Sequence, residues 1–337
     1  MLNELTSAFG VSGFEDEVRQ ILIEHNKGMC TSYEIDNLGN LIFYKKGTKG
    51  YHNKIMLSAH IDEVGFIISA ITEEGMLKFK TVGGIDARII QNTKVIIGDK
   101  LINGVIGSKP AHLSKEYQRV KVNDLVIDIG CKSKNEAVSL VNIGDYVMFN
   151  SKYVEFGDDL VKAKALDDRV GCYILSELMK NEFPNDMYFV FTVQEEVGCR
   201  GASIVADKIN PDYSFVIEGT TCSDVPFCIP YNYSTVLGNG PALSMLDNGS
   251  YSDRELTSFL YDTAISNSIP VQYKRVTSGG NDASVIQVSG VGYKVAVVSV
   301  PCRYIHSPVS VASLKDINSC YDLLYNAFSK ENNLWSY

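Results

Sequence analysis

The spacing of apolar residues divides the chain into an α/β segment, a β-rich segment and a second α/β segment. Near the start, apolar residues recur at helical spacing over 14–22. Ser12, with Glu15 three positions later, forms a capping-box pattern that predicts where this helix begins. A strand is predicted over 41–44. The next apolar run, KIMLSA at 54–59, predicts a buried strand that leads directly to a histidine.

The hydrophobic pattern changes after Gly65. Between Phe66 and Glu155 the chain has short runs suited to strands, FIISAI, MLKFKTV, KVIIG, GVIGS, LVIDIG and YVMFN, separated by glycine, aspartate and asparagine. One short helical stretch interrupts them over 134–140. Short strands at this spacing predict a small all-β barrel or sandwich.

From Leu160 onward, helical and strand patterns alternate. A helix is predicted after Asp168, another in GASIVADKI, and further helices over 253–266 and 314–328. The apolar runs YFVFTV, YSFVI, VQYKRV and YKVAVVSV predict the strands between them. This alternation predicts an α/β fold around a mixed sheet.

His60, the histidine that follows the 54–59 strand, forms one chemical set with the acidic and histidine residues of the later α/β segment. We therefore expect one catalytic domain, formed by residues 1–65 and 157–337, which is interrupted by an inserted β domain over 66–156. A chain of 337 residues is long enough for such a pair of domains.

Charge and composition exclude several partners. The net charge is -9 and no run of lysine or arginine could follow a phosphate backbone, so neither nucleic acid nor an anionic membrane is expected as a partner. No apolar stretch approaches the roughly 18 residues of a membrane span, and the N-terminus does not resemble a secretion signal. The eight cysteines are scattered without a C-x-x-C pair, which favours reduced thiols and a cytoplasmic location.

Acidic and histidine residues follow several of the predicted core strands. Because ligands collect at the carboxyl ends of strands in open α/β sheets, these side chains could face one cleft. Two imidazoles and three carboxylates suit two borderline divalent cations such as zinc, and Glu195 would remain free to act as a base. The candidate ligands are His60, Asp167, Glu196, Glu218 and His306.

Each candidate also has a structural reading. Asp62 lies two positions after His60 and could accept its ring N–H, but a strand-end histidine bonded in a turn would look the same. Asp167 and Asp168 precede a helix, where either could serve as an N-cap; Asp168 could also pair with Arg169. Spacing alone does not decide which aspartate would bridge two cations.

Glu195 and Glu196 would diverge on an extended backbone, so one could bind metal while the other faces substrate. In the structural reading, these two adjacent glutamates only lie in a solvated turn. Glu218 and His306 could equally be a turn acid and a surface histidine. The remaining histidines lack the strand-end placement and are given structural readings; they are His25, His52 and His112.

The segments SAHIDEVGF, KALDDRVG, QEEVGCRGA, EGTTCSDVP, SGGNDAS and VPCRYIHSP resemble, in this order, the metallo-aminopeptidase family of glutamyl aminopeptidase and the tetrahedral aminopeptidases. The resemblance covers nearly the whole chain. It implies an α/β/α catalytic domain with an inserted β-barrel that mediates dimerisation, and in many members dimers assemble into a dodecamer. Many relatives have aspartate at the position of Glu218, and some members have been labelled endoglucanases. The implied metal ligands are His60, Asp167 (shared by both metals), Glu196, Glu218 and His306.

The resemblance also implies a reaction. Two zinc or cobalt ions would hold a bridging hydroxide that attacks the amide next to a free N-terminus of a peptide, with Glu195 as general base and Asp62 orienting His60. Two other classes remain open. One is a glycoside hydrolase with two carboxylates, and the other is a non-catalytic assembly stabilised by metal. Substrate contacts are expected from the segment Tyr231–Tyr233 and from the loop with Asn281 and Asp282.

Overall fold

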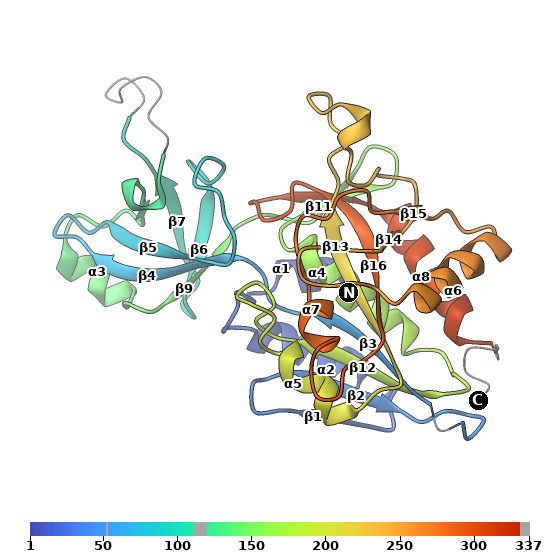
Figure 1. The fold of residues 1–337 in the computed structure, drawn as a ribbon. Helices are drawn as coiled ribbons and strands as arrows, with labels where there is room; N and C mark the ends of the chain where they lie inside the picture. Colours follow the sequence, from blue (N-terminus) through green and yellow to red (C-terminus); the bar gives the residue numbers. More distant parts are fainter. Residues whose placement is uncertain (52, 111–119, 331–337) are drawn as a thin grey trace.

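The computed structural model describes residues 1–51, 53–110 and 120–330. It has two units, a helix-covered mixed sheet and a closed six-stranded antiparallel barrel that projects to one side (Figure 1). The barrel is inserted between the third strand of the chain and the return to the large sheet, as the hydrophobic pattern predicts. Within the described ranges no helix has the length and apolar character needed to cross a bilayer.

The large sheet has eleven strands, nine of which follow in the order β1-β2-β12-β3-β13-β16-β17-β11-β10, with β14 and β15 added beside β16. The central strands β12, β3, β13 and β16 are mutually parallel, so their carboxyl ends meet at one edge. The strands are β1 Ser32–Ile35, β2 Leu41–Lys45, β3 Lys54–His60, β10 Val154–Phe156, β11 Leu160–Ala163, β12 Asp186–Thr192, β13 Tyr213–Thr221, β14 Ala242–Ser244, β15 Gln272–Tyr273, β16 Val295–Arg303 and β17 Ser310–Ser313.

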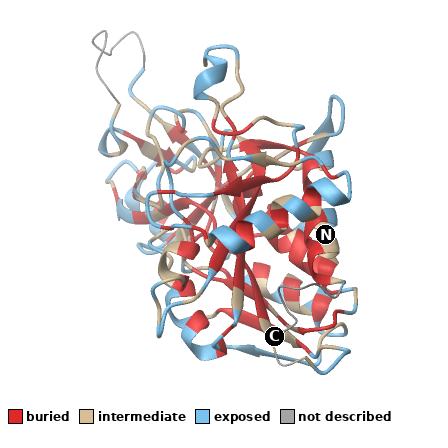
Figure 2. Ribbon diagram, turned by 45° about the vertical axis from the view of Figure 1, so that its right-hand side comes forward, coloured by how far each residue is buried: buried red, intermediate tan, exposed pale blue. Residues whose placement is uncertain are grey.

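Helices cover both faces of this sheet. On β3, Ile55 and Leu57 pack into a core shared with α1, α2, α4, α6 and α8, whereas Met56 faces a smaller core shared with α5 and α7. This alternation gives the α/β/α layers, with buried residues concentrated along the central strands (Figure 2). The helices are α1 Leu2–Ser7, α2 Asp16–Asn26, α4 Leu166–Leu178, α5 Ala202–Ile209, α6 Arg254–Ser266, α7 Ala283–Ile286 and α8 Leu314–Phe328, with a 3-10 turn η3 at Pro230–Asn232.

The inserted unit is a barrel rather than a sandwich, closed in the order β4-β5-β8-β7-β6-β9. Its interior is an apolar cluster around Phe66, Phe79, Ile106, Ile127 and Phe149. Its elements are β4 Gly65–Ile71, β5 Leu77–Val82, β6 Lys94–Ile97, β7 Ile102–Gly107, η2 Val122–Asp124, β8 Val126–Asp128, α3 Lys134–Leu140 and β9 Tyr146–Phe149.

The predicted capping box at the first long helix is wrong. Helix α2 begins at Asp16, after Glu15, and no side chain caps it. The Ser12 hydroxyl instead donates to Asp62, 2.6 Å away, while Glu15 accepts from the Gly13 amide. Ser12 is recruited by a buried carboxylate fifty residues along the chain, a partner that local sequence cannot reveal.

Candidate metal centre

Two groups of possible metal ligands meet at the carboxyl edge of the large sheet, and they share one aspartate. His60, Asp167 and Glu218 form the first group, and Asp167, Glu196 and His306 form the second. Within each group the potential ligand atoms all lie within 4.8 Å of one another. All five residues selected from the sequence are therefore brought together.

The Asp167 carboxylate lies between the two imidazoles and offers one oxygen to each. Its Oδ1 is 3.4 Å from His60 Nε2, and its Oδ2 is 3.5 Å from His306 Nε2. Glu218 Oε2 lies 3.8 Å from the same nitrogen of His60, and Glu196 Oε2 lies 3.3 Å from that of His306. This is the arrangement that a carboxylate bridging two cations requires.

The five side chains come from five segments: β3, the start of α4, the turn after β12, β13 and the turn after β16. His60 is the last residue of β3. Glu218 lies inside β13, which continues to Thr221, so the expectation that it ends its strand is wrong. A Cβ on Gly219 would lie 2.9 Å from Asp167 Cα, so a glycine is needed for Asp167 to approach β13 this closely.

Asp168 has the structural role expected of one member of the aspartate pair. Its Oδ1 accepts a hydrogen bond from the Gly171 amide at the start of the helical part of α4. Arg169 pairs with Glu63 rather than with Asp168, and it also donates to the carbonyls of Ile61 and Leu5. Asp168 therefore caps the helix, while Asp167 faces the two imidazoles.

Both imidazoles have Nε2 directed to the carboxylates and Nδ1 held by a carbonyl. His60 Nδ1 is 3.1 Å from the Asp62 carbonyl and 3.4 Å from its Oδ1, and His306 Nδ1 is 3.1 Å from the Gly84 carbonyl. A carbonyl only accepts hydrogen bonds, so each Nδ1 carries the proton, and in the neutral ring Nε2 keeps a lone pair for a cation. Gly84 belongs to the inserted unit, which thus helps to orient one candidate ligand.

Asp62 connects the first imidazole to the adjacent glutamates. It accepts hydrogen bonds from the backbone amides of Glu195, at 2.9 Å, and Glu196, at 3.1 Å. The Ser12 hydroxyl is a third donor, and Asp62 itself is fully buried. One carboxylate therefore positions His60 and the turn that carries the two glutamates.

The charge balance of the site calls for cations. Burial raises the pKa of Glu196 to about 7 and raises that of Glu218 well above its usual value. Burial opposes the charging of His306, yet Asp167 and Glu196 raise its pKa to about 9. Oδ1 of Asp167 and Oε1 of Glu218 are buried and accept no hydrogen bond from the described part of the chain. Buried acceptors without donors are costly, and oxygen and imidazole ligands suit a divalent cation.

Glu195 stands beside the two shared groups without belonging to either. Burial raises its pKa well above the usual value, and Asp282 and Glu196 raise it further. Glu195 belongs to two further groups, one with His60 and Glu196 and the other with Cys199 and Asp282. In each group the potential ligand atoms lie within 4.8 Å of one another. A partly buried carboxylate next to the centre, with an elevated pKa, has the properties of a general base or acid.

The other sequence candidates have different outcomes. His25 forms an ion pair with Glu4 and is in neither group of candidate ligands. Of the two loop residues, Asp282 lies near Glu195, and Asn281 donates a hydrogen bond to Asp247. Tyr231 is 91% exposed. His52 and His112 fall outside the described residues. Sequence reasoning missed Cys199, because a single cysteine in a turn gives no pattern.

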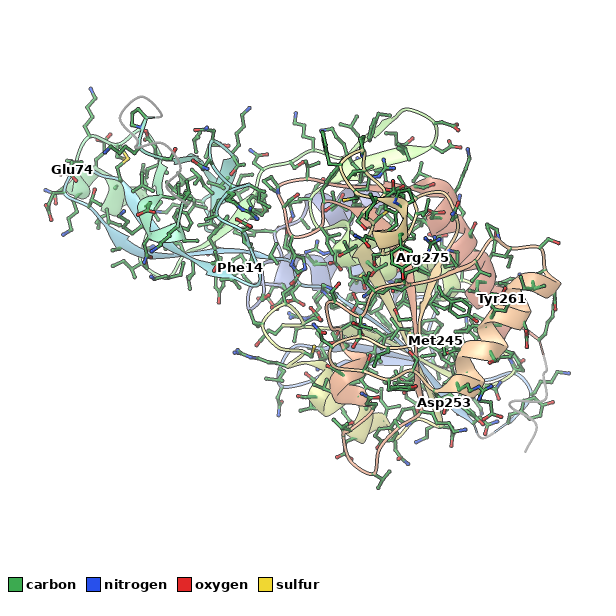
Figure 3. All side chains as sticks on the ribbon, turned by 45° about the horizontal axis from the view of Figure 1, so that its top comes forward. Phe14, Glu74, Met245, Asp253, Tyr261 and Arg275 are labelled. Carbon is green, nitrogen blue, oxygen red and sulfur yellow. The ribbon has the colours of Figure 1, made fainter. Side chains whose placement is uncertain are left out.

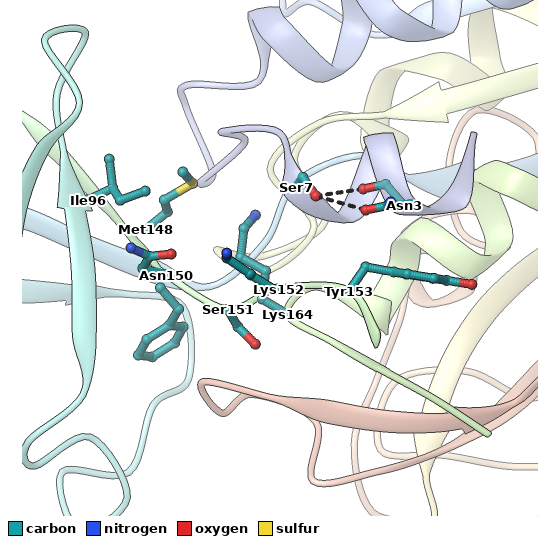
Figure 4. A pocket seen from close by; sticks show the side chains of 10 residues that line it. Asn3, Ser7, Ile96, Met148, Asn150, Ser151, Lys152, Tyr153 and Lys164 are labelled. Atoms are coloured by element: carbon teal, nitrogen blue, oxygen red, sulfur yellow. Dashed lines mark hydrogen bonds between the residues drawn. The ribbon is translucent and has the colours of Figure 1, made fainter. Parts of the chain in front are cut away.

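A separate cavity lies where the two units meet (Figure 4). It measures about 380 Å³ and is bordered by α1, by Ile96 and Met148 of the barrel, and by Lys152 and Lys164. Lys164 is committed to other partners, since it donates to the Ala8 carbonyl and to Glu63. The cavity does not include the candidate ligands. A much smaller one, about 10 Å³, is bordered by Asp167, Glu196 and His306.

A family model, M42 glutamyl aminopeptidase, matches residues 39–323. The chain belongs to this family. It is 38% identical over 330 residues to a putative aminopeptidase of Acetivibrio thermocellus, covering 97% of each chain. This M42 chain is thus a member of a metallo-aminopeptidase family and a peptide hydrolase.

Solved structures agree with this assignment. An aminopeptidase from Desulfurococcus kamchatkensis superimposes with a TM-score of 0.95 at 34% identity, covering 99% of this chain and 95% of that one. The TET1 peptidase of Pyrococcus horikoshii, described as assembling into a tetrahedron or an octahedral shell, has a TM-score of 0.87 at 36% identity over 98% of each chain. Some similar structures carry the name endoglucanase.

Proposed function

We propose that this M42 chain removes single residues from the free N-terminus of peptides at a centre of two divalent metal ions. His60, Asp167 and Glu218 would hold one ion, and Asp167, Glu196 and His306 the other. The observation that supports this most is the position of Asp167, whose two oxygens face two different imidazoles at 3.4 and 3.5 Å. A carboxylate that bound a single cation would need an imidazole beside only one of its two oxygens.

Zinc or cobalt suits this donor set of imidazoles and carboxylates. When bound, two such ions supply Lewis acidity and lower the pKa of a water molecule towards neutrality. The residues that would hold them direct Nε2 atoms to the Asp167 carboxylate and present buried carboxylate oxygens without donors among the described residues. The site therefore needs little rearrangement to accept the ions.

Glu195 would move the proton. Its carboxylate takes a proton from the attacking water and returns it to the leaving amine, as a general base and then a general acid. Asp62 acts as a positioning residue. Its carboxylate accepts a hydrogen bond from the Glu195 amide, and its Oδ1 lies 3.4 Å from His60 Nδ1.

A glycoside hydrolase would use two carboxylates about 5–10 Å apart and would have no role for two imidazoles. The close approach of His60 and His306 to the acids supports the metallopeptidase instead. A metal-stabilised scaffold would have no use for Glu195, a buried carboxylate next to the centre that neither shared group needs.

The test is a panel of aminoacyl anilides assayed with and without chelator. We expect cleavage that EDTA abolishes and that zinc or cobalt restores, with no hydrolysis of N-acetylated anilides or of soluble cellulose derivatives. Acetylation removes the free amine that defines an exopeptidase substrate. Hydrolysis of the glucan, or cleavage of the acetylated and free anilides at equal rates, would contradict the proposal; so would an inert metal-loaded protein.

We also propose that the barrel forms the contact between subunits, first in dimers and then in a dodecamer, and that the protein works in the reducing cytoplasm. Apolar side chains that are exposed on the barrel support the first point, and eight cysteines without a disulfide support the second. Light scattering after size exclusion tests the assembly, and Ile143→Glu should shift it to smaller species. The exposed barrel residues include Leu101, Val105, Val138 and Ile143.

A further inference from the structure

A third group of ligand-type side chains lies next to the proposed metal pair. Glu195 and Cys199 are in the turns that follow β12, and Asp282 directly precedes α7. The potential ligand atoms of the three residues lie within 4.8 Å of one another. The Cys199 thiol is 3.5 Å from Glu195 Oε1, and the Ser284 hydroxyl is 3.8 Å from the same sulfur.

Asp282 shows that this group is incomplete. Only 1% of the residue is exposed, and its Oδ2 accepts a 2.5 Å hydrogen bond from the Thr192 hydroxyl. Its Oδ1 is buried and has no hydrogen-bond partner among residues 1–51, 53–110 and 120–330. The Cys199 thiol is a side-chain hydrogen-bond partner of the Asp282 carboxylate, beside the Thr192 hydroxyl. A buried carboxylate that has one oxygen without a donor, and that lies within 4.8 Å of a thiol and a second carboxylate, is costly unless a positive charge joins the group.

Nearby basic residues do not supply that charge. Among the described residues, no lysine or arginine forms a salt bridge with Glu195 or Asp282. Against the effect of burial, the positive group that lowers the pKa of both Glu195 and Asp282 is His60, and its ring nitrogens lie beside Asp62 and Asp167. Two carboxylates and a thiol form a donor set that is softer than the two oxygen- and nitrogen-rich groups of the pair.

We propose that Glu195, Cys199 and Asp282 form a third cation site, selective for thiophilic divalent ions such as zinc, and that its occupation inhibits the enzyme. The inference rests on the proposed function, because inhibition follows from the role of Glu195 as general base. A cation bound to its carboxylate occupies the oxygens that would otherwise accept the proton of the attacking water. Binding also displaces the thiol proton into solvent, so affinity rises with pH.

Cobalt titration of the metal-free protein tests the site, because sulfur-to-cobalt charge transfer gives a near-ultraviolet band that oxygen and nitrogen ligands do not produce. The first two equivalents should restore anilide cleavage without this band, because neither group of the pair contains a cysteine. Further cobalt should raise the band and lower the activity together. Metal analysis should then find a third ion for each chain.

Cys199→Ser is the diagnostic variant, and Cys228→Ser is the matched control, since Cys228 is also a partly buried cysteine but lies outside the group. In the Cys199 variant the band should be absent, and inhibition should need at least about tenfold more metal, because removal of a direct ligand costs no less than that of an outer-shell partner. The Cys228 variant should retain both properties.

Asp282→Asn gives a second route if the Cys199 variant does not fold, because the amide oxygen can still accept from Thr192 while the charge is lost. It should weaken the third ion by a similar factor. A band that persists in the Cys199 variant, or inhibition by excess metal that neither substitution weakens, would overturn the third site. Failure of the first two equivalents to restore cleavage would instead refute the proposed function, since the band and the third ion can be measured without turnover.

Discussion

The barrel and the carboxyl edge of the large sheet use buried space in opposite ways. In the described part of residues 64–163, no polar or charged side chain is buried, and the barrel interior is aliphatic and aromatic. The sheet edge, by contrast, buries His60, Asp62, Asp167 and Glu218 close together. Packing alone stabilises the barrel, whereas the sheet edge needs specific partners for its charges. The first region can tolerate apolar exchange, and the second cannot.

The two regions meet at a narrow contact that also bears on the site. Phe14 lies there (Figure 3) and stacks on Tyr146 of the barrel with ring centroids 5.3 Å apart. Glu74, at the far tip of the barrel, is distant from this contact. The Gly84 carbonyl of the inserted unit holds His306. The barrel thus contributes one backbone atom to the orientation of a candidate ligand.

Glu195→Gln should have the largest effect, confined to the sheet edge. Turnover of aminoacyl anilides should fall by about 10²–10⁴, the usual contribution of a general base. The two ions of the proposed pair should stay bound, because Glu195 belongs to neither group that shares Asp167. Glu73→Gln, which removes an exposed carboxylate of the inserted unit, is the control and should keep normal turnover. Substantial turnover in the Glu195 variant would reject its role.

Ile127→Ala tests the barrel as a unit stabilised by packing. Ile127 is fully buried in the barrel core, so we expect a loss of about 2–5 kcal/mol in the free energy of unfolding. Turnover per folded molecule should stay near that of the wild type. Urea denaturation and active-site titration measure the two quantities separately. A fall in turnover while the protein remains folded would show that the two regions are coupled more tightly than their contacts indicate.

Metal removal should affect the two regions unequally. Free zinc at about one hundred times its dissociation constant stabilises a site by about 3 kcal/mol, and this stabilisation should be local to the sheet edge. Hydrogen exchange followed by mass spectrometry should show faster exchange in EDTA for peptides at the carboxyl ends of β3, β12 and β13. Peptides from β5, β7 and β8 should be unchanged. Equal acceleration in both regions would contradict this division.

Glu15→Gln tests the segment that also carries Phe14, the residue stacked on the barrel, and should have the smallest effect. Burial raises the pKa of Glu15 to about 7. Because this folded-state pKa lies above the unfolded one, the group favours folding below about pH 4.5, and this contribution is lost as the pH rises through 7. The full shift corresponds to about 3 kcal/mol, and residual solvent contact reduces our expectation to about 2 kcal/mol.

The glutamine variant should therefore be more stable than the wild type at pH 8 and should differ little from it near pH 4. Urea midpoints measured in EDTA across this range, with Glu24→Gln as the exposed control, provide the comparison. If the urea midpoints of the wild type and the variant changed in parallel with pH, the pKa of Glu15 would be the same in the folded and unfolded protein.

The sequence predicted the barrel better than it predicted local structure near the site. Each of the short runs between residues 66 and 149 became a strand, because alternating burial in an apolar barrel leaves a direct trace in the sequence. The pattern did not separate barrel from sandwich, since closure depends on pairing between distant strands. The helix α1 and the short strands β1, β10 and β17 were not predicted; they are too short for a periodic signal.

For the site, residue type and the end of an apolar run suggested the five candidate ligands. The choice of Asp167 as the shared one came from the family resemblance, and Glu218 lies inside its strand rather than at its end. These two signals were not enough to identify the bonds that position the ligands. Asp62 holds two backbone amides and Ser12, and His306 is held by Gly84, more than two hundred residues earlier. Such contacts depend on tertiary folding. Cys199 was missed for the same reason, since its partner Asp282 lies eighty residues away in the chain.

Metal counting in matched variants tests the central claim, that Asp167 serves two cations, most directly. Purified protein dialysed against zinc and then against buffer should retain two ions for each chain. Glu218→Gln and Glu196→Gln should each lose one, whereas Asp167→Asn should lose most of both. Equal losses of metal in all three variants would contradict the shared carboxylate. So would an Asp167→Asn variant that keeps one of its two ions at full occupancy.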